Sequence, residues 1–168
     1  MPFDKVPFGE IDAFNVVVEV PTGGQKKYEY DAEINAIKLD KVLYGQEKFP
    51  LNYGHVAETF AQDQSLLDVF VFSTYPITTG TVVTCRAIGV LKVIDEGKKD
   101  DKILAVPIAE TALEHLQDIA DIPKDQLFAI EEFYKFLPKS WNKQIEYKEI
   151  LGKAEAIKEL QAAREFKD

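Results

Sequence analysis

Carboxylates and lysines gather in two short segments of this 168-residue chain. Asp63 and Asp68 lie just before and at the start of an apolar run, and residues 95–102 read Asp-Glu-Gly-Lys-Lys-Asp-Asp-Lys. Mg²⁺ prefers oxygen ligands and takes one or two carboxylates together with waters and substrate phosphates. Two acidic loops on neighbouring strands would therefore suit two metal ions bridged by phosphate, with the lysines neutralising the remaining charge. Taken singly, aspartates such as Asp63 and Asp68 more often solubilise loops and form turns than bind metal, and residues 95–102 also fit a charged hairpin tip.

Two other segments place polar side chains on the faces of regular elements. In one predicted strand, alternation puts Lys27, Glu29 and Asp31 on the same face. Cross-strand ion pairs on a solvated face are an alternative explanation of that pattern. In a predicted helix further along the chain, the spacing of Tyr134 favours a core position, whereas Lys135 is expected to be solvated.

The elements that must position these side chains follow from the hydrophobic period. β-Branched and alternating segments predict strands in the first part of the chain, and a period near 3.6 predicts helices in the second part. The predicted strands are 14–20, 27–31, 36–43, 53–59, 67–73, 81–94 and 102–106. The predicted helices are a stripe from Ala112 through Leu113 and Leu116 to Ile119, a stripe from Leu127 to Leu137 that ends at Pro138, and an amphipathic helix at 146–166.

Strands that come first and helices that follow predict an α+β fold and exclude an alternating βαβ sheet. The long segment 81–94 contains Gly89, which indicates a bent strand of the kind that small closed barrels require. We therefore expect a small closed β-barrel with flanking C-terminal helices. The length favours one domain over residues 1–168.

The composition narrows the function class. The net charge of -9 disfavours nucleic acid or an anionic membrane as a partner, and no apolar run is long enough for a membrane span. The start of the chain does not read as a signal peptide, and a single cysteine, Cys85, suits a reducing compartment, so we expect a cytoplasmic protein. An anionic substrate would be repelled by such a charge unless the carboxylates hold metal ions.

Read in order, the segments resemble the family I soluble inorganic pyrophosphatases over about residues 14–136. The segments that carry the resemblance are VVVEVP at 16–21, KYEYD at 27–31, FPLNYG at 49–54, D-x-x-x-x-D-V at 63–69, TYPITTGTVV at 74–83, CRAIGVLKVIDE at 85–96, D-x-K-I-L-A-V-P at 100–107 and FYK at 133–135. The resemblance implies a five-stranded barrel of the oligonucleotide-binding type, a homohexamer, and Mg²⁺-dependent hydrolysis of pyrophosphate to two phosphates.

The resemblance also implies roles for particular residues. The metal ligands would be Asp63, Asp68, Asp95 and Asp100, with the first three also acting in catalysis. The phosphates would be held by Lys27, Lys41, Tyr53, Lys102, Tyr134 and Lys135. Glu19, Glu29 and Glu96 would support the network of metal and water.

The sequence departs from the family pattern at three of these places. The family's aspartate loop reads D-G-D-P-x-x-D or D-G-D-P-x-D, whereas Ser65 stands here at the middle carboxylate, which the family assigns to the nucleophilic water. Lys41 replaces an arginine, which exchanges a bidentate fork for a point charge. Phe49 replaces a tyrosine. All three changes are expected to touch one pocket.

Loss of a general base typically costs about 10²–10⁴-fold in rate, so we predict a slow pyrophosphatase in which Ser65 limits catalysis. Asp63 or Asp101 is a candidate to take over the missing role. Two alternatives stay open. One is a catalytically impaired paralogue that binds pyrophosphate or a nucleotide in a regulatory or assembly role, and the other is hydrolysis of a different phosphoanhydride.

Overall fold

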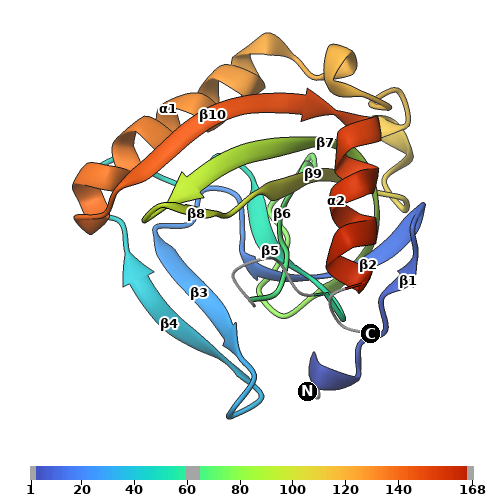
Figure 1. Ribbon diagram of the computed structural model, residues 1–168, viewed down its shortest axis with the longest axis horizontal. Coiled ribbons are helices and arrows are strands. Elements are labelled where there is room, and N and C mark those ends of the chain that lie inside the picture. The colour runs from blue at the N-terminus through green and yellow to red at the C-terminus, as the bar shows by residue number, and fades with distance from the viewer. Residues whose placement is uncertain (1–2, 60–64, 166–168) are drawn as a thin grey trace.

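Five strands of the larger sheet close into a β-barrel (Figure 1). The computed structural model describes residues 3–59 and 65–165. In their order around the barrel, the strands are β2 (Ala13–Val20), β5 (Asn52–Val56), β6 (Asp68–Val71), β9 (Lys102–Pro107) and β7 (Val82–Asp95). Pairing of β7 with β2 closes the barrel, and β6 and β9 run parallel while the other neighbours are antiparallel. This confirms the expected closed five-stranded barrel.

The remaining strands lie outside this ring. β1 (Gly9–Glu10), β8 (Lys98–Lys99) and β10 (Ile145–Gly152) extend the larger sheet, while β3 (Lys26–Asp31) and β4 (Ala36–Val42) form a separate hairpin beside the barrel (Figure 1). The seven predicted strands correspond to β2 to β7 and β9, and the sequence patterns did not predict β1, β8 or β10.

The helices cover the outside of the larger sheet. They are three 3₁₀ turns, η1 (Phe3–Lys5), η2 (Thr111–Leu113) and η3 (Ile119–Asp121), and two α-helices, α1 (Lys124–Trp141) and α2 (Lys153–Glu165). α1 packs against β10, and α2 packs against β7 (Figure 1). Within the described residues, no helix has the length and apolar character needed to cross a bilayer.

Because β7 is bent, it pairs with several different strands along its length. Its first residues pair with β2, its middle pairs with β9, and its last residues pair with β10. The register with β9 shifts between Ala87 and Gly89. A Cβ on Gly89 would lie 2.8 Å from the carbonyl oxygen of Leu151, so this close approach requires glycine. The expected bent strand is therefore present.

Two hydrophobic clusters hold the helices to the barrel. One joins Phe70 and Leu104 of the barrel to Ile130 and Phe133 of α1. The other joins Leu160 of α2 to a different set of buried barrel residues. The first cluster continues directly into the pocket described below, so α1 is fixed where its side chains can line it.

The predicted helix over residues 112–119 is wrong, because the chain forms the two short turns η2 and η3 there. The guanidinium group of Arg86 donates hydrogen bonds to the carbonyl oxygens of Leu113 and Leu116. Asp118 and Asp121 form a capping box that starts a new turn at Ile119. Side-chain partners thus take over backbone groups that a continuous helix would pair internally.

The predicted helix at 146–166 is correct only in its second part, α2, because the first part is the strand β10. β10 pairs with β7 from Ile145 opposite Asp95 onwards, and its register shifts between Tyr147 and Glu149. This bulge changes the strand alternation, so the apolar spacing from Tyr147 to Ile150 imitates a helical turn. The prediction that α1 ends at Pro138 is also wrong, since the helix continues to Trp141.

Candidate active site

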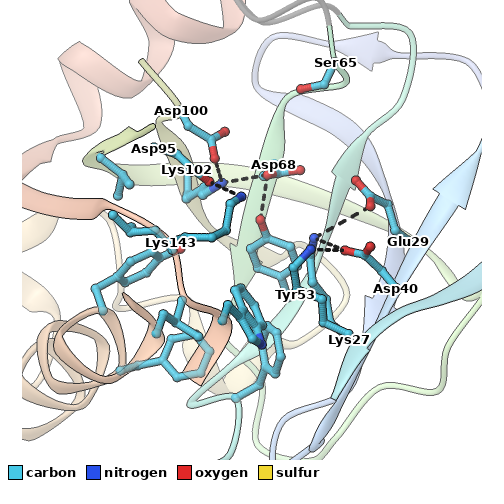
Figure 2. A pocket seen from close by; sticks show the side chains of 18 of the residues that line it. Lys27, Glu29, Asp40, Tyr53, Ser65, Asp68, Asp95, Asp100, Lys102 and Lys143 are labelled. Atoms are coloured by element: carbon cyan, nitrogen blue, oxygen red, sulfur yellow. Dashed lines mark hydrogen bonds and ion pairs between the residues drawn. The ribbon is translucent and has the colours of Figure 1, made fainter. Parts of the chain in front are cut away.

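A pocket of about 460 Å³ lies between the barrel, the β3–β4 hairpin and the C-terminal part of α1. Figure 2 shows that charged side chains from the barrel, the hairpin and the segment after α1 point toward one another across it. The charged and hydroxyl-bearing residues that line the pocket are Lys27, Glu29, Tyr30, Asp40, Lys41, Tyr53, Ser65, Asp68, Asp95, Asp100, Lys102, Tyr134 and Lys143. The fold therefore gathers acidic and basic groups that are far apart in the sequence.

The barrel contributes a connected cluster that we call the floor, formed by Tyr53, Asp68, Asp100 and Lys102. Asp68 and Lys102 lie opposite each other in the parallel β6–β9 ladder. The Lys102 ammonium donates to Asp68 Oδ2 at 2.7 Å and to Asp100 Oδ2 at 2.7 Å, and the Tyr53 hydroxyl donates to Asp68 Oδ2 at 2.6 Å (Figure 2). The Lys102 side chain is only 5% exposed, so these hydrogen bonds satisfy a charge that is almost fully buried.

The floor is charged at neutral pH. Burial opposes the charge on Lys102, but the negative charges around it, that of Asp68 above all, outweigh burial and hold its pKa well above the ordinary value. Burial alone would raise the pKa of Asp68, yet the charge and hydrogen bond of Lys102 lower it. Burial and the charge of Asp68 raise the pKa of Tyr53, so its hydroxyl stays protonated and donates.

The hairpin contributes a second group that we call the hairpin rim, formed by Lys27, Glu29, Asp40 and Lys41. The Lys27 ammonium donates to Asp40 Oδ2 at 2.9 Å and lies 3.7 Å from Glu29 Oε2. Burial opposes the charge on Lys27, but its acidic neighbours, Glu29 first, raise its pKa. Burial also raises the pKa of Glu29. Lys41 is 3.6 Å from Asp40 Oδ2, so the rim carries two cations against two carboxylates.

A third group follows the end of α1. Asn142 adopts a left-handed conformation with φ of 51°, which turns the chain back over the pocket. Behind this turn, the Lys143 ammonium donates to Asp95 Oδ2 at 3.1 Å. The other oxygen of that carboxylate, Asp95 Oδ1, is buried and has no hydrogen-bond partner among the described residues. The Trp141 ring centroid lies 5.9 Å from the ammonium of Lys27 and 5.7 Å from that of Lys41.

Aromatic side chains form the wall next to α1. Phe49 is 2% exposed and packs between Tyr53 and Phe133, with ring centroids 5.6 and 4.9 Å apart. Tyr134 packs edge-on against Phe133 and Phe70. Burial raises the pKa of Tyr134, so its hydroxyl stays protonated and is available as a donor.

The carboxylates do not form a ready metal centre as they stand. Among the described residues, no group of three histidine, cysteine, aspartate or glutamate side chains converges closely enough to hold a metal ion. The ammonium of Lys102 bridges Asp68 and Asp100, and that of Lys143 contacts Asp95, so lysines supply the positive charge between these oxygens. A divalent cation would therefore compete with lysines for the same carboxylates.

Comparisons with known proteins identify the family of this chain. The family model for inorganic pyrophosphatase matches residues 16–167. The chain belongs to this family. The inorganic pyrophosphatase of Thermoplasma volcanium is 40% identical over 158 residues, which cover 91% of this chain and 92% of the relative. Soluble inorganic pyrophosphatase 1 of Arabidopsis thaliana is 37% identical over 153 residues, which cover 91% of this chain and 72% of the relative.

The crystal structure of inorganic pyrophosphatase from Thermus thermophilus superposes with a TM-score of 0.93 at 34% identity, and the match covers 99% of each chain. The pyrophosphatase family and its barrel fold, inferred above from the sequence, are therefore confirmed. This family fold brings together most of the residues predicted for the site. Those that line the pocket are Lys27, Glu29, Lys41, Tyr53, Ser65, Asp68, Asp95, Asp100, Lys102 and Tyr134.

Three predicted residues do not line the pocket. Glu19 is buried beneath the hairpin and accepts a hydrogen bond from the backbone N–H of Tyr30 at 2.5 Å. Glu96, in the turn after β7, accepts one from the backbone N–H of Gln144 at 3.1 Å. Lys135 is 59% exposed and pairs with glutamates of its own helix. The structure thus places these three outside the pocket lining, and their predicted roles stay predictions.

The sequence offered two candidates, Asp63 and Asp101, for the catalytic role that Ser65 cannot fill. Asp63 lies outside the described residues. Asp101 is 5% exposed and pairs with Lys92 at 2.9 Å, away from the pocket lining. The three departures from the family pattern, Ser65, Lys41 and Phe49, all line the same pocket, as expected from the sequence.

The sequence patterns missed Asp40, Trp141 and Lys143 as pocket residues. Lys27 pairs with Lys41 while Tyr28 pairs with Leu39, so Asp40 is the extra residue of a β-bulge. Strict alternation would place Asp40 and Lys41 on opposite faces, whereas the bulge lets both reach the pocket. A usable signal for Asp40 was its neighbour Lys41, which stands where the family has an arginine. Lys143 had no such signal, because its place depends on the left-handed turn at Asn142.

Proposed function

We propose that this chain hydrolyses inorganic pyrophosphate to two phosphate ions in the pocket described above. One observation carries the proposal: a chain of the pyrophosphatase family places five carboxylates and four lysines around one cavity. The relatives compared above are inorganic pyrophosphatases. The lysines offset most of the acidic charge of the lining, and metal ions on the carboxylates would remove the remaining repulsion of an anionic substrate.

The donor set fits Mg²⁺, in line with the divalent-metal requirement that the family suggests. Asp68, Asp95 and Asp100, together with Asp63, would hold the ions, since hard cations take carboxylate oxygens. The unpartnered buried oxygen Asp95 Oδ1 supports this fit, because an unpaired anionic oxygen calls for a positive partner. Bound Mg²⁺ would lower the pKa of a water and neutralise developing charge on the phosphates.

The chain's own cations and hydroxyls would bind the substrate. Lys102 and Tyr53 on the floor and Lys27 and Lys41 on the hairpin rim all face the cavity with donors directed at acidic oxygens. Phosphate oxygens would replace some of these carboxylate contacts. Tyr134 would add a hydroxyl from α1.

The remaining predicted residues would act around this centre. Lys135 would need to leave its pairs with Glu131 and Glu132 to contact phosphate. Glu19 would support the site through the backbone of the hairpin, since its carboxylate holds the N–H of Tyr30. Glu29, which lines the pocket, and Glu96, in the turn after Asp95, would support the network of metal and water.

Ser65 sets the expected speed of the reaction. Its hydroxyl does not take up a proton near neutral pH, so it cannot replace a carboxylate as general base. We therefore propose a pyrophosphatase slower than relatives that carry the full aspartate loop.

The test is a colorimetric measurement of phosphate released from pyrophosphate by the purified protein, with Mg²⁺ or with excess EDTA. We expect release that needs Mg²⁺. No release above the buffer control at any Mg²⁺ concentration would contradict the proposed hydrolysis.

A second candidate is a binding protein that has lost turnover, and the absence of a carboxylate at Ser65 favours it. Isothermal titration with pyrophosphate, and separately with ADP, in the presence of Mg²⁺ distinguishes the two. Tight binding of either ligand without phosphate release supports the binding role, whereas release at saturating pyrophosphate supports the enzyme.

We also propose that the chain forms a homohexamer in the cytoplasm, with pyrophosphate rather than nucleic acid or membrane as its partner. The family resemblance supports the hexamer, and the single cysteine, which is buried, supports a reducing compartment. Light scattering coupled to size-exclusion chromatography tests the assembly. A mass near six times 19.0 kDa is expected, and a monomer would contradict the proposal.

A further inference from the structure

Lys143 is held less firmly in the pocket than Lys102 and Lys27 are. Lys102 is 5% exposed and bonds to two carboxylates, and Lys27 is 18% exposed with Asp40 at 2.9 Å and Glu29 at 3.7 Å. The Lys143 side chain is 32% exposed, and among the described residues its ammonium pairs with Asp95 alone, at 3.1 Å. Lys41 is held as loosely, at 33% exposed and 3.6 Å from Asp40, but the carboxylate that Lys143 neutralises, Asp95, is one predicted to bind metal.

The backbone of Lys143 is nevertheless well placed. Its N–H donates to the carbonyl oxygen of Pro138 at 3.1 Å, which closes the turn after α1, and β10 begins two residues later. Figure 2 shows the side chain reaching from this turn toward Asp95 and Lys102. A fixed backbone with a long, flexible side chain lets the ammonium change partners without moving the helix.

We propose that Lys143 is a phosphate-binding residue that is masked by Asp95 until divalent cations occupy the pocket. Without metal, the ammonium neutralises Asp95. With Mg²⁺ bound, Lys143 is released from that carboxylate and binds a phosphate oxygen of the substrate. The inference rests on the proposed function and adds to it an order of events, in which metal binding exposes a substrate-binding cation.

The charges of the pocket support this order. Mg²⁺ carries twice the charge of an ammonium and approaches a carboxylate oxygen at about 2.0–2.1 Å, so it is the stronger partner for Asp95. Lys143 itself remains inside the pocket lining after release, because its turn is anchored. Once released from Asp95, the ammonium lies in a partly enclosed cavity, where it can form a charge-assisted hydrogen bond with a phosphate oxygen of the substrate.

The proposal predicts opposite effects of one substitution on two ligands. Lys143→Met removes the competitor of Mg²⁺, so the metal-free protein should bind Mg²⁺ about two- to fivefold more tightly. The same change removes a phosphate contact, so imidodiphosphate, a pyrophosphate analogue that resists hydrolysis, should bind about tenfold more weakly at saturating Mg²⁺. Lys143→Arg should keep both affinities near those of the wild type.

Isothermal titration calorimetry measures both affinities without any need for turnover. Lys148→Met is the matched control, since it removes the same charge from an exposed lysine of β10 that pairs with Glu146 outside the pocket. Lys143→Ala provides a second variant, and circular dichroism checks that each variant is folded.

Tighter Mg²⁺ binding together with weaker imidodiphosphate binding in both Lys143 variants, and neither change in the control, supports the proposal. Unchanged or weaker Mg²⁺ binding, unchanged imidodiphosphate binding, or equal shifts in the Lys148 control would overturn it. Absence of phosphate release by the wild type would count against the proposed hydrolysis alone, because neither titration depends on it.

Discussion

The floor and the hairpin rim of the pocket hold their charges in different ways. On the floor, Asp68 and Lys102 sit opposite each other in two strands of a closed barrel, and the Lys102 side chain is 5% exposed. On the rim, Lys27 and Lys41 belong to a two-stranded hairpin outside that barrel, and Lys41 is 33% exposed. The floor lysine is thus almost fully desolvated, whereas the rim includes a lysine, Lys41, that is in contact with water.

The departures from the family pattern spare the floor. The floor residues Tyr53, Asp68, Asp100 and Lys102 all match the resemblance drawn from the sequence. The changes fall elsewhere, at Lys41 on the rim, at Phe49 in the aromatic wall and at Ser65 ahead of β6. Removal of a buried charge destabilises the fold because it leaves a buried partner without its counter-charge. Substitution of an exposed charge costs little stability.

The largest effect is expected from Lys102→Met. Loss of this ammonium leaves Asp68 and Asp100 without their shared partner and removes a phosphate contact from the floor. We expect turnover to fall by about 10²–10³-fold. The free energy of unfolding, measured in urea, should fall by about 1–3 kcal/mol. A variant with wild-type turnover would show that the floor is not the substrate site.

A smaller effect is expected on the rim. Lys41→Met should raise KM for pyrophosphate by about tenfold with little change in stability, because the Lys41 side chain is 33% exposed and its ion pair with Asp40 is long, at 3.6 Å. Lys41→Arg restores a bidentate donor and should lower KM by about threefold. Steady-state kinetics of both variants test this, and a loss of stability in Lys41→Met as large as in Lys102→Met would remove the contrast between rim and floor.

The smallest effect concerns pH. The folded-state pKa of Asp68 is lowered, so its contribution to stability is present above the ordinary value of 3.8 and is lost as pH falls through the lower folded value. The pKa of Lys102 is raised, so its contribution is present below 10.5 and is lost as pH rises through the higher folded value. The stability difference between wild type and Asp68→Asn should therefore be constant from about pH 5 to 8 and should shrink below about pH 4.

Urea unfolding at a series of pH values measures that difference. Asp125→Asn, which changes an aspartate of the first turn of α1 outside the pocket lining, is the control. A difference that grows as the pH is lowered would contradict the assigned direction of the Asp68 shift.

The barrel was predictable because its strands carry their own signals. Alternating and β-branched runs located the barrel strands, and Gly89 indicated the bend in β7. The failures occurred where long-range partners override local spacing. Arg86 binds the carbonyl oxygens that a helix over 112–119 would need, and a bulge in β10 gives a strand the apolar spacing of a helix.

The pocket lining was predictable where the chain follows the family pattern in sequence order, as at Asp68, Asp95, Asp100 and Lys102. The pocket lining was not predictable where an irregularity of the backbone directs a side chain into the pocket. Asp40 reaches the pocket through a bulge, and Lys143 reaches it through a left-handed turn. Neither irregularity has a strong local signature, because each depends on the pairing or packing of distant segments.

The most direct test of the account is turnover of Ser65→Asp beside the wild type, measured as phosphate release at saturating Mg²⁺ and pyrophosphate. The account holds that the floor and rim already bind the substrate and that a missing carboxylate limits the rate. It predicts slow but Mg²⁺-dependent release by the wild type and a kcat about 10²–10⁴-fold higher in Ser65→Asp. No release by either protein would contradict it, as would equal rates in the two.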